Sequence, residues 1–173
     1  MDKVKVGKGT YGELRIYSFQ NNREKLTIGN YCSIAGAVVF ILGGEHPYKR
    51  LFTFPFSSKV LHAVCGEQTP TKGPIVVEDD VWIGNGSQIL SGVTLGKGSI
   101  IGAGSIVSKS IPPYAIYAGS KIIKYRFSEK VIEKIMAIDF SNTTIEAMNK
   151  YLEYCLIDVT DDNIDDIVSC FKS

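Results

Sequence analysis

Aliphatic residues recur at every sixth position through the second half of the chain. Each of them is Val, Ile or Leu, and they are Val77, Ile83, Ile89, Leu95, Ile101 and Val107. A second set, mostly small, follows four places after each: Val81, Ser87, Val93, Ser99, Ser105 and Ile111. A period of six fits neither an amphipathic helix nor an alternating strand. Repetition at this short, fixed spacing is typical of a parallel β-helix built from hexapeptide repeats.

The repeats form two blocks. Ile28, Ile34 and Phe40 belong to the first block, and the second runs from about Ile75 to Ala118. Three hexads are expected to make one triangular coil, with the strands of successive coils about 4.8 Å apart. The aliphatic side chains then stack inward and the small ones lie near the corners. The pattern therefore predicts a mainly β fold, with a parallel β-helix domain over residues 1–120.

Residues 43–74 interrupt the repeat and hold both histidines of the chain, His46 and His62. A long irregular stretch inside a regular domain is commonly functional, so we expect a protruding loop that carries chemistry. Its aromatic residues are Tyr48, Phe52, Phe54 and Phe56. They are more typical of a loop core, and stacking on a sugar ring or a planar drug is the alternative.

The last part of the chain, residues 121–173, changes character. Ser128 precedes an amphipathic run with Val131, Ile132 and Ile135, which predicts an N-cap and a helix. Two further helices are predicted over 144–156 and 161–171. Because a bare coil end exposes core and unpaired strand edges, we expect this helical appendage to cap the open end of the coil.

Composition excludes several classes of function. The 173 residues are 45% hydrophobic and carry a formal net charge of +1, so nothing favours a nucleic-acid partner. No apolar run is long enough for a membrane span, and no apolar signal segment follows Met1. The four cysteines are scattered without a Cys-x-x-Cys pair, as expected for reduced thiols. These features predict a cytoplasmic protein.

Three further sequence features point to one family. They are Gly44-Glu45-His46-Pro47 in the interrupting loop, Asp-Asp-Val-Trp-Ile-Gly over 79–84 and Ile-Gly-Ala-Gly-Ser-Ile-Val over 101–107. Together with the hexads, they resemble the hexapeptide-repeat acyltransferases, and most of all their xenobiotic and sugar O-acetyltransferase branch, which includes chloramphenicol and streptogramin acetyltransferases. The similarity covers roughly residues 6–127. It implies left-handed coils, acetyl-CoA as co-substrate and a homotrimer with its site between neighbouring subunits.

The same resemblance implies that His46 is the general base. Acetyl transfer from a thioester to a hydroxyl or amine needs a group that takes the acceptor's proton, and neutral imidazole suits that task. No covalent intermediate is required when both substrates are held together. Neighbouring residues of an extended chain point apart, so we expect Glu45 to face solvent and a backbone carbonyl to orient the imidazole. His62 lies outside the matched motif and is expected to be structural or to face the acceptor.

The positions that the resemblance assigns to acetyl-CoA are Asn85, Ala103, Ser108, Lys109, Lys121 and Lys124. Arg126 is a further candidate, although a solvated surface position is favoured for it. The relatives usually read Gly-Asn-Pro-Ala-Lys where this chain has Gly119-Ser120-Lys121, which leaves the register of Lys121 and Lys124 open. Weaker candidates for the acceptor are Asn30, Tyr31, Tyr48 and Trp82. Packing against the loop is the alternative for Trp82.

The acceptor is expected to be a sugar or nucleotide sugar, with an antibiotic as the alternative. A hypothesis of another class is a non-catalytic trimeric scaffold. A trimeric metal-dependent carbonic anhydrase would need three histidines for each metal site, and this chain has two histidines. We therefore predict no metal.

Overall fold

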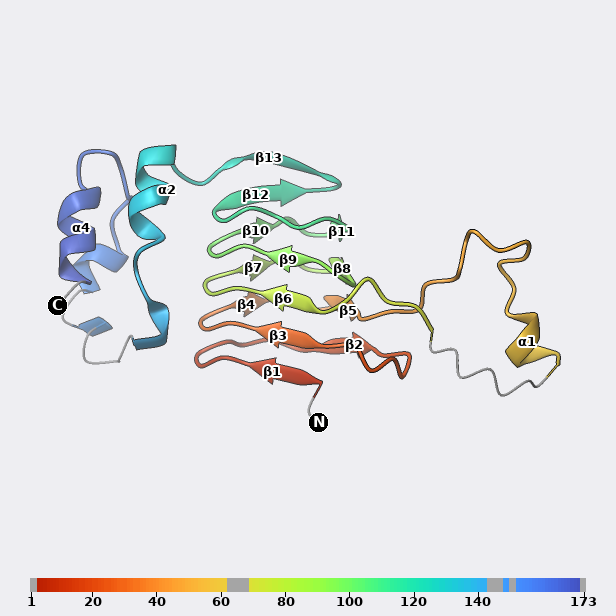
Figure 1. Ribbon diagram of the computed structural model, residues 1–173. Coiled ribbons are helices and arrows are strands. Elements are labelled where there is room, and N and C mark those ends of the chain that lie inside the picture. Colours follow the sequence, from red (N-terminus) through yellow and green to blue (C-terminus); the bar gives the residue numbers. More distant parts are fainter. Residues whose placement is uncertain (1–2, 62–68, 143–147, 150–151, 172–173) are drawn as a thin grey trace.

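Short strands stacked into a three-sided prism form the main body of the molecule (Figure 1). The computed structural model describes residues 3–61, 69–142, 148–149 and 152–171. Sheet A contains β1 (Val4–Val6), β3 (Leu26–Ile28), β6 (Ile75–Val77) and β9 (Thr94–Leu95). Sheet B contains β4 (Ser33–Ile34), β7 (Trp82–Ile83), β10 (Ile100–Ile101), β12 (Ala115–Ala118) and the antiparallel β13 (Lys121–Tyr125). Sheet C contains β2 (Arg15–Tyr17), β5 (Val39–Ile41), β8 (Gln88–Leu90) and β11 (Ile106–Val107).

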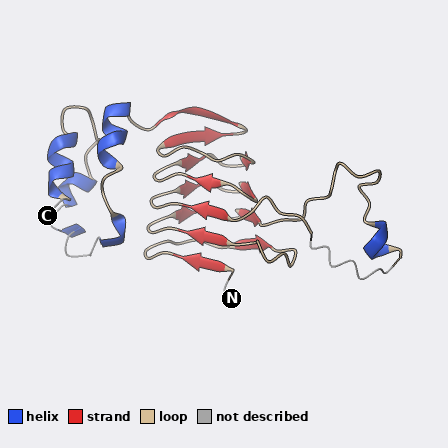
Figure 2. Cartoon of the chain, in the orientation of Figure 1, coloured by secondary structure: helices blue, strands red, loops and turns tan. Residues whose placement is uncertain are grey.

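The chain passes through sheets A, B and C in turn, coil after coil, and all their pairs except β12–β13 are parallel. The prediction of a mainly β fold with parallel sheets is confirmed. Figure 2 shows that the strands form the stack, whereas the described helices lie in the interrupting loop and after β13.

Register explains why a period of six suits this fold. Three inward ladders run up the prism, one for each sheet: Ile28–Val77–Leu95, Ile34–Ile83–Ile101 and Phe40–Ile89–Val107. All nine side chains are at most 3% exposed. Because each hexad advances the chain by one face, every sixth residue returns to the core. Burying each side chain contributes about 1.5–3 kcal/mol.

Three columns of turns form the corners of the prism. Corner AB contains residues 29–32, 78–81, 96–99 and 112–114. Corner BC contains 35–38, 84–87, 102–105 and 119–120. Among the described residues, corner CA contains 18–25, 42–61, 69–74, 91–93 and 108–110. At corner AB, Tyr31, Asp80, Gly98 and Tyr114 all adopt a positive φ between 56° and 65°. At Gly98 a Cβ would lie 2.3 Å from a ring carbon of Tyr114, so glycine is required there.

The segment that interrupts the repeats leaves and re-enters the coil at corner CA. It carries α1 (Phe56–Lys59), which lies well to one side of the stacked strands in Figure 1. Residues 62–68, and with them His62, fall outside the described part of the chain.

A strand, and not the expected helical cap, follows β12 at the end of the coil. Gly119 and Ser120 form a tight turn, and β13 returns antiparallel along β12 at the end of sheet B. The first residues of the expected helical appendage thus belong to a sheet. The loss of two residues relative to the family pattern is consistent with so short a turn. The division of the chain into domains at residue 120 stays a prediction.

The helices that follow β13 lie beside corner AB rather than over the end of the coil (Figure 1). They are α2 (Glu129–Ile135), η1 (Phe140–Asn142), η2 (Leu152–Cys155) and α4 (Ile164–Cys170). Ser128 caps α2, as predicted, by accepting the N–H of Val131 at 3.3 Å. Of the helix predicted over 144–156, residues 144–147 and 150–151 lie outside the described residues, and its last part is the short 3-10 helix η2. The helix predicted over 161–171 is α4.

A second small core joins these helices to the coil. Tyr114 of corner AB packs with Val131, Ile135, Ile164 and Val168. Further down, Lys97 donates to the carbonyl of Ile138, and the Lys8 Nζ atom lies 2.6 Å from the carbonyl oxygen of Ser141. The C-terminal segment therefore runs along one corner from the last coil to the first. Within the described residues, no helix has the length and apolar character that crossing a membrane requires.

Candidate active site

His46 lies in the interrupting loop with its ring held by the backbone. Its Nδ1 atom is 2.7 Å from the carbonyl oxygen of Thr53. A carbonyl oxygen can only accept, so Nδ1 carries the proton and Nε2 is left as the acceptor nitrogen. The side chain is exposed. The expectation that a backbone carbonyl orients this imidazole is confirmed, and the orientation is the one that a general base needs.

Glu45, the residue before this histidine, connects the loop to the coil. Its Oε1 atom accepts a hydrogen bond from Ser91 Oγ at 3.3 Å and lies 3.3 Å from Lys72 Nζ. Ser91 belongs to the turn of the next coil at corner CA, and the Glu45 side chain is 37% exposed. The side chain is thus partly exposed, as expected, but it also has long-range partners that sequence spacing does not reveal.

An aromatic cluster surrounds the residue that holds His46. Phe52 and Phe54 flank Thr53, and the ring centre of each lies 5.1 Å and 4.8 Å, respectively, from that of Phe56, in edge-to-face geometry. The three residues are 44–58% exposed, and Tyr48 is 80% exposed. They touch one another but do not form a covered core, so the loop-core interpretation is wrong. An uncovered aromatic surface beside a base suits the apolar face of a second molecule.

Corner BC brings three of the predicted acetyl-CoA residues together. The N–H of Gly104 donates to the carbonyl of Asn85 at 2.8 Å, and the Asn85 side chain donates to the carbonyl of Gly36 at 2.8 Å. Ala103 stacks so closely over Gly84 that a Cβ at residue 84 would lie 2.5 Å from the Ala103 nitrogen. Lys121 follows at the top of the same corner. The column presents mostly backbone, as an extended ligand would need.

The other predicted acetyl-CoA residues lie elsewhere. Ser108 and Lys109 are exposed at corner CA, the corner that bears the His46 loop. Lys124 lies on β13 opposite Ile116. Within one chain the predicted set is therefore spread over different sides of the prism, and a single copy does not bring it together.

Of the four acceptor candidates, Tyr48 alone shares a loop with His46. Asn30 lies at corner AB, where its Oδ1 accepts the N–H of Lys8 at 3.0 Å and its Nδ2 donates to Asp79 at 3.1 Å. Tyr31 follows in a left-handed turn with φ of 56°. Trp82 projects from the outer face of sheet B and is 53% exposed. In one chain the structure separates these three from the loop, and hydrogen bonds between coils engage the Asn30 side chain.

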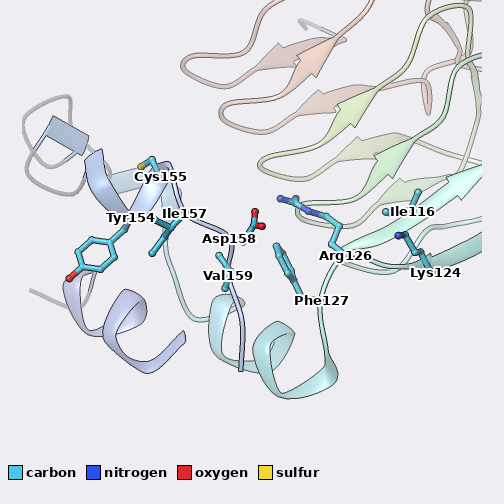
Figure 3. A pocket seen from close by; sticks show the side chains of 9 residues that line it. All are labelled: Ile116, Lys124, Arg126, Phe127, Tyr154, Cys155, Ile157, Asp158 and Val159. Atoms are coloured by element: carbon cyan, nitrogen blue, oxygen red, sulfur yellow. The ribbon is translucent and has the colours of Figure 1, made fainter. Parts of the chain in front are cut away.

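An open pocket of about 410 Å³ lies between the β12–β13 hairpin and residues 154–159. Figure 3 shows Lys124, Arg126 and Phe127 on the hairpin side and Tyr154 and Asp158 on the other. Arg126 is not the solvated residue that the sequence favoured. Its Nη1 atom lies 3.1 Å from Asp80 Oδ2 and 2.7 Å from the carbonyl oxygen of Gly98. Burial raises the pKa of Asp80, and this guanidinium opposes the rise.

The described residues contain no group of three or more His, Cys, Asp or Glu side chains arranged to hold a metal ion. That the protein uses no metal stays a prediction.

Known proteins resemble this chain in sequence and in fold. Residues 74–109 match the family described as bacterial transferase hexapeptide (six repeats). A probable macrolide acetyltransferase from Lysinibacillus sphaericus is 41% identical over 139 residues, 75% of this chain and 76% of that protein. A chloramphenicol acetyltransferase from Klebsiella aerogenes is 31% identical over 162 residues, 83% of this chain and 77% of that protein.

A solved structure agrees at the level of the fold. AntD, an N-acyltransferase from Bacillus cereus in complex with dTDP and 3-hydroxybutyryl-CoA, matches with a TM-score of 0.54 and 18% identity, over 88% of this chain and 81% of that one. The stacked coils and the histidine loop together define a protein of the hexapeptide-repeat class. This chain belongs to the hexapeptide-repeat acetyltransferases, and it is an enzyme, an acyltransferase. The hypothesis of a non-catalytic scaffold is therefore set aside.

Proposed function

We propose that this enzyme transfers an acetyl group from acetyl-CoA directly to an acceptor hydroxyl or amine, with His46 as general base. The Nε2 atom takes the acceptor's proton as the acceptor oxygen or nitrogen attacks the thioester carbonyl. The new C–O or C–N bond forms, the C–S bond breaks, and the CoA sulfur leaves and takes up a proton. The observation that carries the proposal is the Nδ1 contact with Thr53, which leaves Nε2 free to accept.

Acetyl-CoA is proposed to lie along corner BC. The close backbone column at Asn85 and Ala103 offers N–H and carbonyl groups to a pantetheine arm, and Lys121 and Lys124 on the hairpin offer charge to the phosphates. Ser108 and Lys109 would meet the ligand only from a neighbouring copy. The acyl-CoA complex of AntD supports a CoA thioester as the donor.

A homotrimer is the proposed assembly, because one chain holds His46 and the donor column at different corners. The outer faces of two sheets support this. Trp82 on sheet B and Tyr17 and Ile106 on sheet C are 51–57% exposed. The outward row of sheet A is mostly polar and contains Lys5, Thr27, the half-buried Val76 and Thr94. Two apolar faces and one polar face fit a closed ring in which each prism meets two neighbours. We also propose left-handed winding of the coils, which an experimental structure would test together with the trimer.

The acceptor is proposed to be a hydroxyl compound with a large apolar surface, as in the antibiotic alternative. The support is the uncovered cluster of Phe52, Phe54 and Phe56 next to Thr53. Relatives that are 41% and 31% identical act, by their names, on macrolides and chloramphenicol. The sugar acceptor that we first expected has no comparable support among the described contacts of the loop.

A thiol-release assay tests the proposal. The purified protein is incubated with acetyl-CoA and a panel of macrolides, chloramphenicol, glycosides and nucleotide sugars. We expect turnover with an antibiotic, and a loss of about 10²- to 10⁴-fold in His46→Ala at unchanged trimer mass. His62→Ala is the matched control and should retain activity. An equal loss in His62→Ala, with His46→Ala active, would reverse the assignment of the base.

A further inference from the structure

A fully buried carboxylate lies beneath the catalytic loop. Glu24 belongs to residues 18–25, the turn of the first coil at corner CA, and its side chain is 0% exposed. It accepts the N–H of Phe19 at 2.9 and 3.1 Å and the hydroxyl of Ser18 at 2.5 Å, and it pairs with Lys3 at 3.2 Å. Glutamate is seldom so buried without partners. These partners make the turn rigid.

The first root of the loop rests directly on this turn. A Cβ at Gly43 would lie 2.8 Å from Glu24 Oε1, and a Cβ at Gly44, where φ is 89°, would lie 2.6 Å from the Phe19 ring. The Phe19 N–H is one of the groups that the carboxylate holds. Glu24 and Phe19 thus pack against the two glycines that come directly before Glu45 and His46.

The second root is attached to the same turn. Asn21 Nδ2 donates to the carbonyl of Thr69 at 2.8 Å, and the N–H of Glu24 donates to the carbonyl of Asn21 at 3.3 Å. The two roots are also joined to each other, since Thr71 Oγ1 lies 2.5 Å from the carbonyl oxygen of Leu42. Both ends of the loop are thus fixed relative to one buried charge.

We infer that Glu24 is a positioning residue for His46. It touches neither the acceptor nor acetyl-CoA and acts through Phe19, Gly43 and Gly44 on the direction in which the loop leaves the coil. The inference rests on the proposed role of His46 as the base. Proton transfer and attack need close alignment, and a misplacement of about 1 Å by a distant change can cost about 100-fold in rate.

Steady-state kinetics of Glu24→Gln test this inference. The substitution keeps the side-chain shape but removes the charge and one acceptor. We expect kcat to fall about 10- to 100-fold, with the KM for acetyl-CoA within about 2-fold, because the proposed donor column lies at corner BC. If the variant were instead partly unfolded, its thermal melting curve would show a smaller folded fraction at the assay temperature.

A double-mutant cycle with His46→Ala, measured at high enzyme concentration, separates positioning from a structural defect. If Glu24 acts through His46, adding Glu24→Gln to His46→Ala should change kcat by less than about 2-fold. If Glu24→Gln lowers kcat as strongly in the His46→Ala background as it does in the wild-type enzyme, the inference is overturned. Glu78→Gln is the matched control, since Glu78 accepts the N–H of Lys97 at 2.7 Å but lies at corner AB. It should keep the wild-type kcat.

Phe19→Leu provides a second route in case Glu24→Gln does not fold. Phe19 is 39% exposed, so the change removes the ring that packs against Gly44 at little cost to the core. We expect the same fall in kcat and the same absence of effect in His46→Ala. If His46→Ala itself retains activity, the proposed function fails. If His46→Ala is inactive but Phe19→Leu and Glu24→Gln behave as wild type, the positioning role alone fails.

Discussion

The coil and the loop that carries His46 are both rich in apolar residues, but the coil buries them and the loop leaves them exposed. In the coil, Phe40 is 0% exposed because the register places Ile89 directly above it. In the loop, Leu51 is 89% exposed and Phe54 is 51% exposed. A repeat supplies every side chain with a partner from the next coil, whereas the loop has no repeat and finds few partners in its own chain. The difference teaches that apolar groups stabilise the fold in one region and are available for contact with other molecules in the other.

The largest effect should come from the coil side of this comparison. Phe40→Ala leaves a cavity in an inward ladder, and the paired strands above and below prevent neighbouring side chains from filling it. We expect a loss of about 3–5 kcal/mol in the free energy of unfolding. Urea unfolding followed by circular dichroism measures it. The matched change in the loop is Phe54→Ala, which should stay within about 0.5 kcal/mol of wild type and raise the KM for the acceptor. Equal losses of stability in the two variants would break the comparison.

The boundary between the two regions should be sensitive to acid. Burial acts to raise the pKa of Glu24, but the hydrogen bonds from Ser18, Phe19 and Lys3 outweigh it and leave the pKa below its ordinary value of 4.5. Stability from this group is therefore present above pH 4.5 and is lost as the pH falls toward the folded-state value. Glu24→Gln should cost about 1–3 kcal/mol at pH 7.

Urea unfolding of Glu24→Gln and wild type between pH 7 and pH 3 checks this linkage. The gap in the free energy of unfolding between the two proteins should narrow below pH 4.5. A gap that stays constant through the acid range would show that the carboxylate does not contribute through its charge.

The C-terminal segment, which lies along corner AB, offers a second contrast with the loop, because a charged side chain of the coil binds it. Lys97 Nζ donates to the carbonyl of Ile138 and lies 4.4 Å from the ring centre of Phe140. Lys97→Met should lower the free energy of unfolding by about 1–2 kcal/mol and expose the segment to protease. Lys5→Met, on the outer face of sheet A, is the control and should change neither property.

The smallest effect concerns two tyrosines of the coil, for which removal of the hydroxyl should change the free energy of unfolding in opposite directions. The Tyr114 hydroxyl is buried and has no hydrogen-bond partner among the described residues, whereas the Tyr117 hydroxyl donates to the carbonyl of Ile106 at 2.9 Å. Tyr114→Phe should be neutral or stabilise by up to about 1 kcal/mol, and Tyr117→Phe should cost about 1 kcal/mol. Differential scanning calorimetry measures both, and a destabilised Tyr114→Phe would mean that its hydroxyl has a partner.

Much of the coil could be predicted because its contacts follow from local spacing. Ile83 and Ile101 were expected in the core from the period alone, and Ser128 was expected to cap a helix from its place before an apolar run. The partners of Glu45, Arg126 and Glu24 were missed. Each of these residues finds its partner across about 20 residues or more in Lys72, Asp80 and Lys3. No periodicity relates such partners, so no sequence pattern reveals them.

The amino-acid sequence by itself determined that the chain coils in hexads, that the coil is interrupted at one corner, and that His46 stands in the interruption. These follow from side-chain size at fixed spacing, which acts between neighbouring turns of the chain. Only the tertiary structure decided where the helices dock, which nitrogen of His46 contacts the Thr53 carbonyl, and which buried carboxylate lies under its loop. Those outcomes depend on directional hydrogen bonds and ion pairs between distant segments, and such bonds exist only after the coils have stacked.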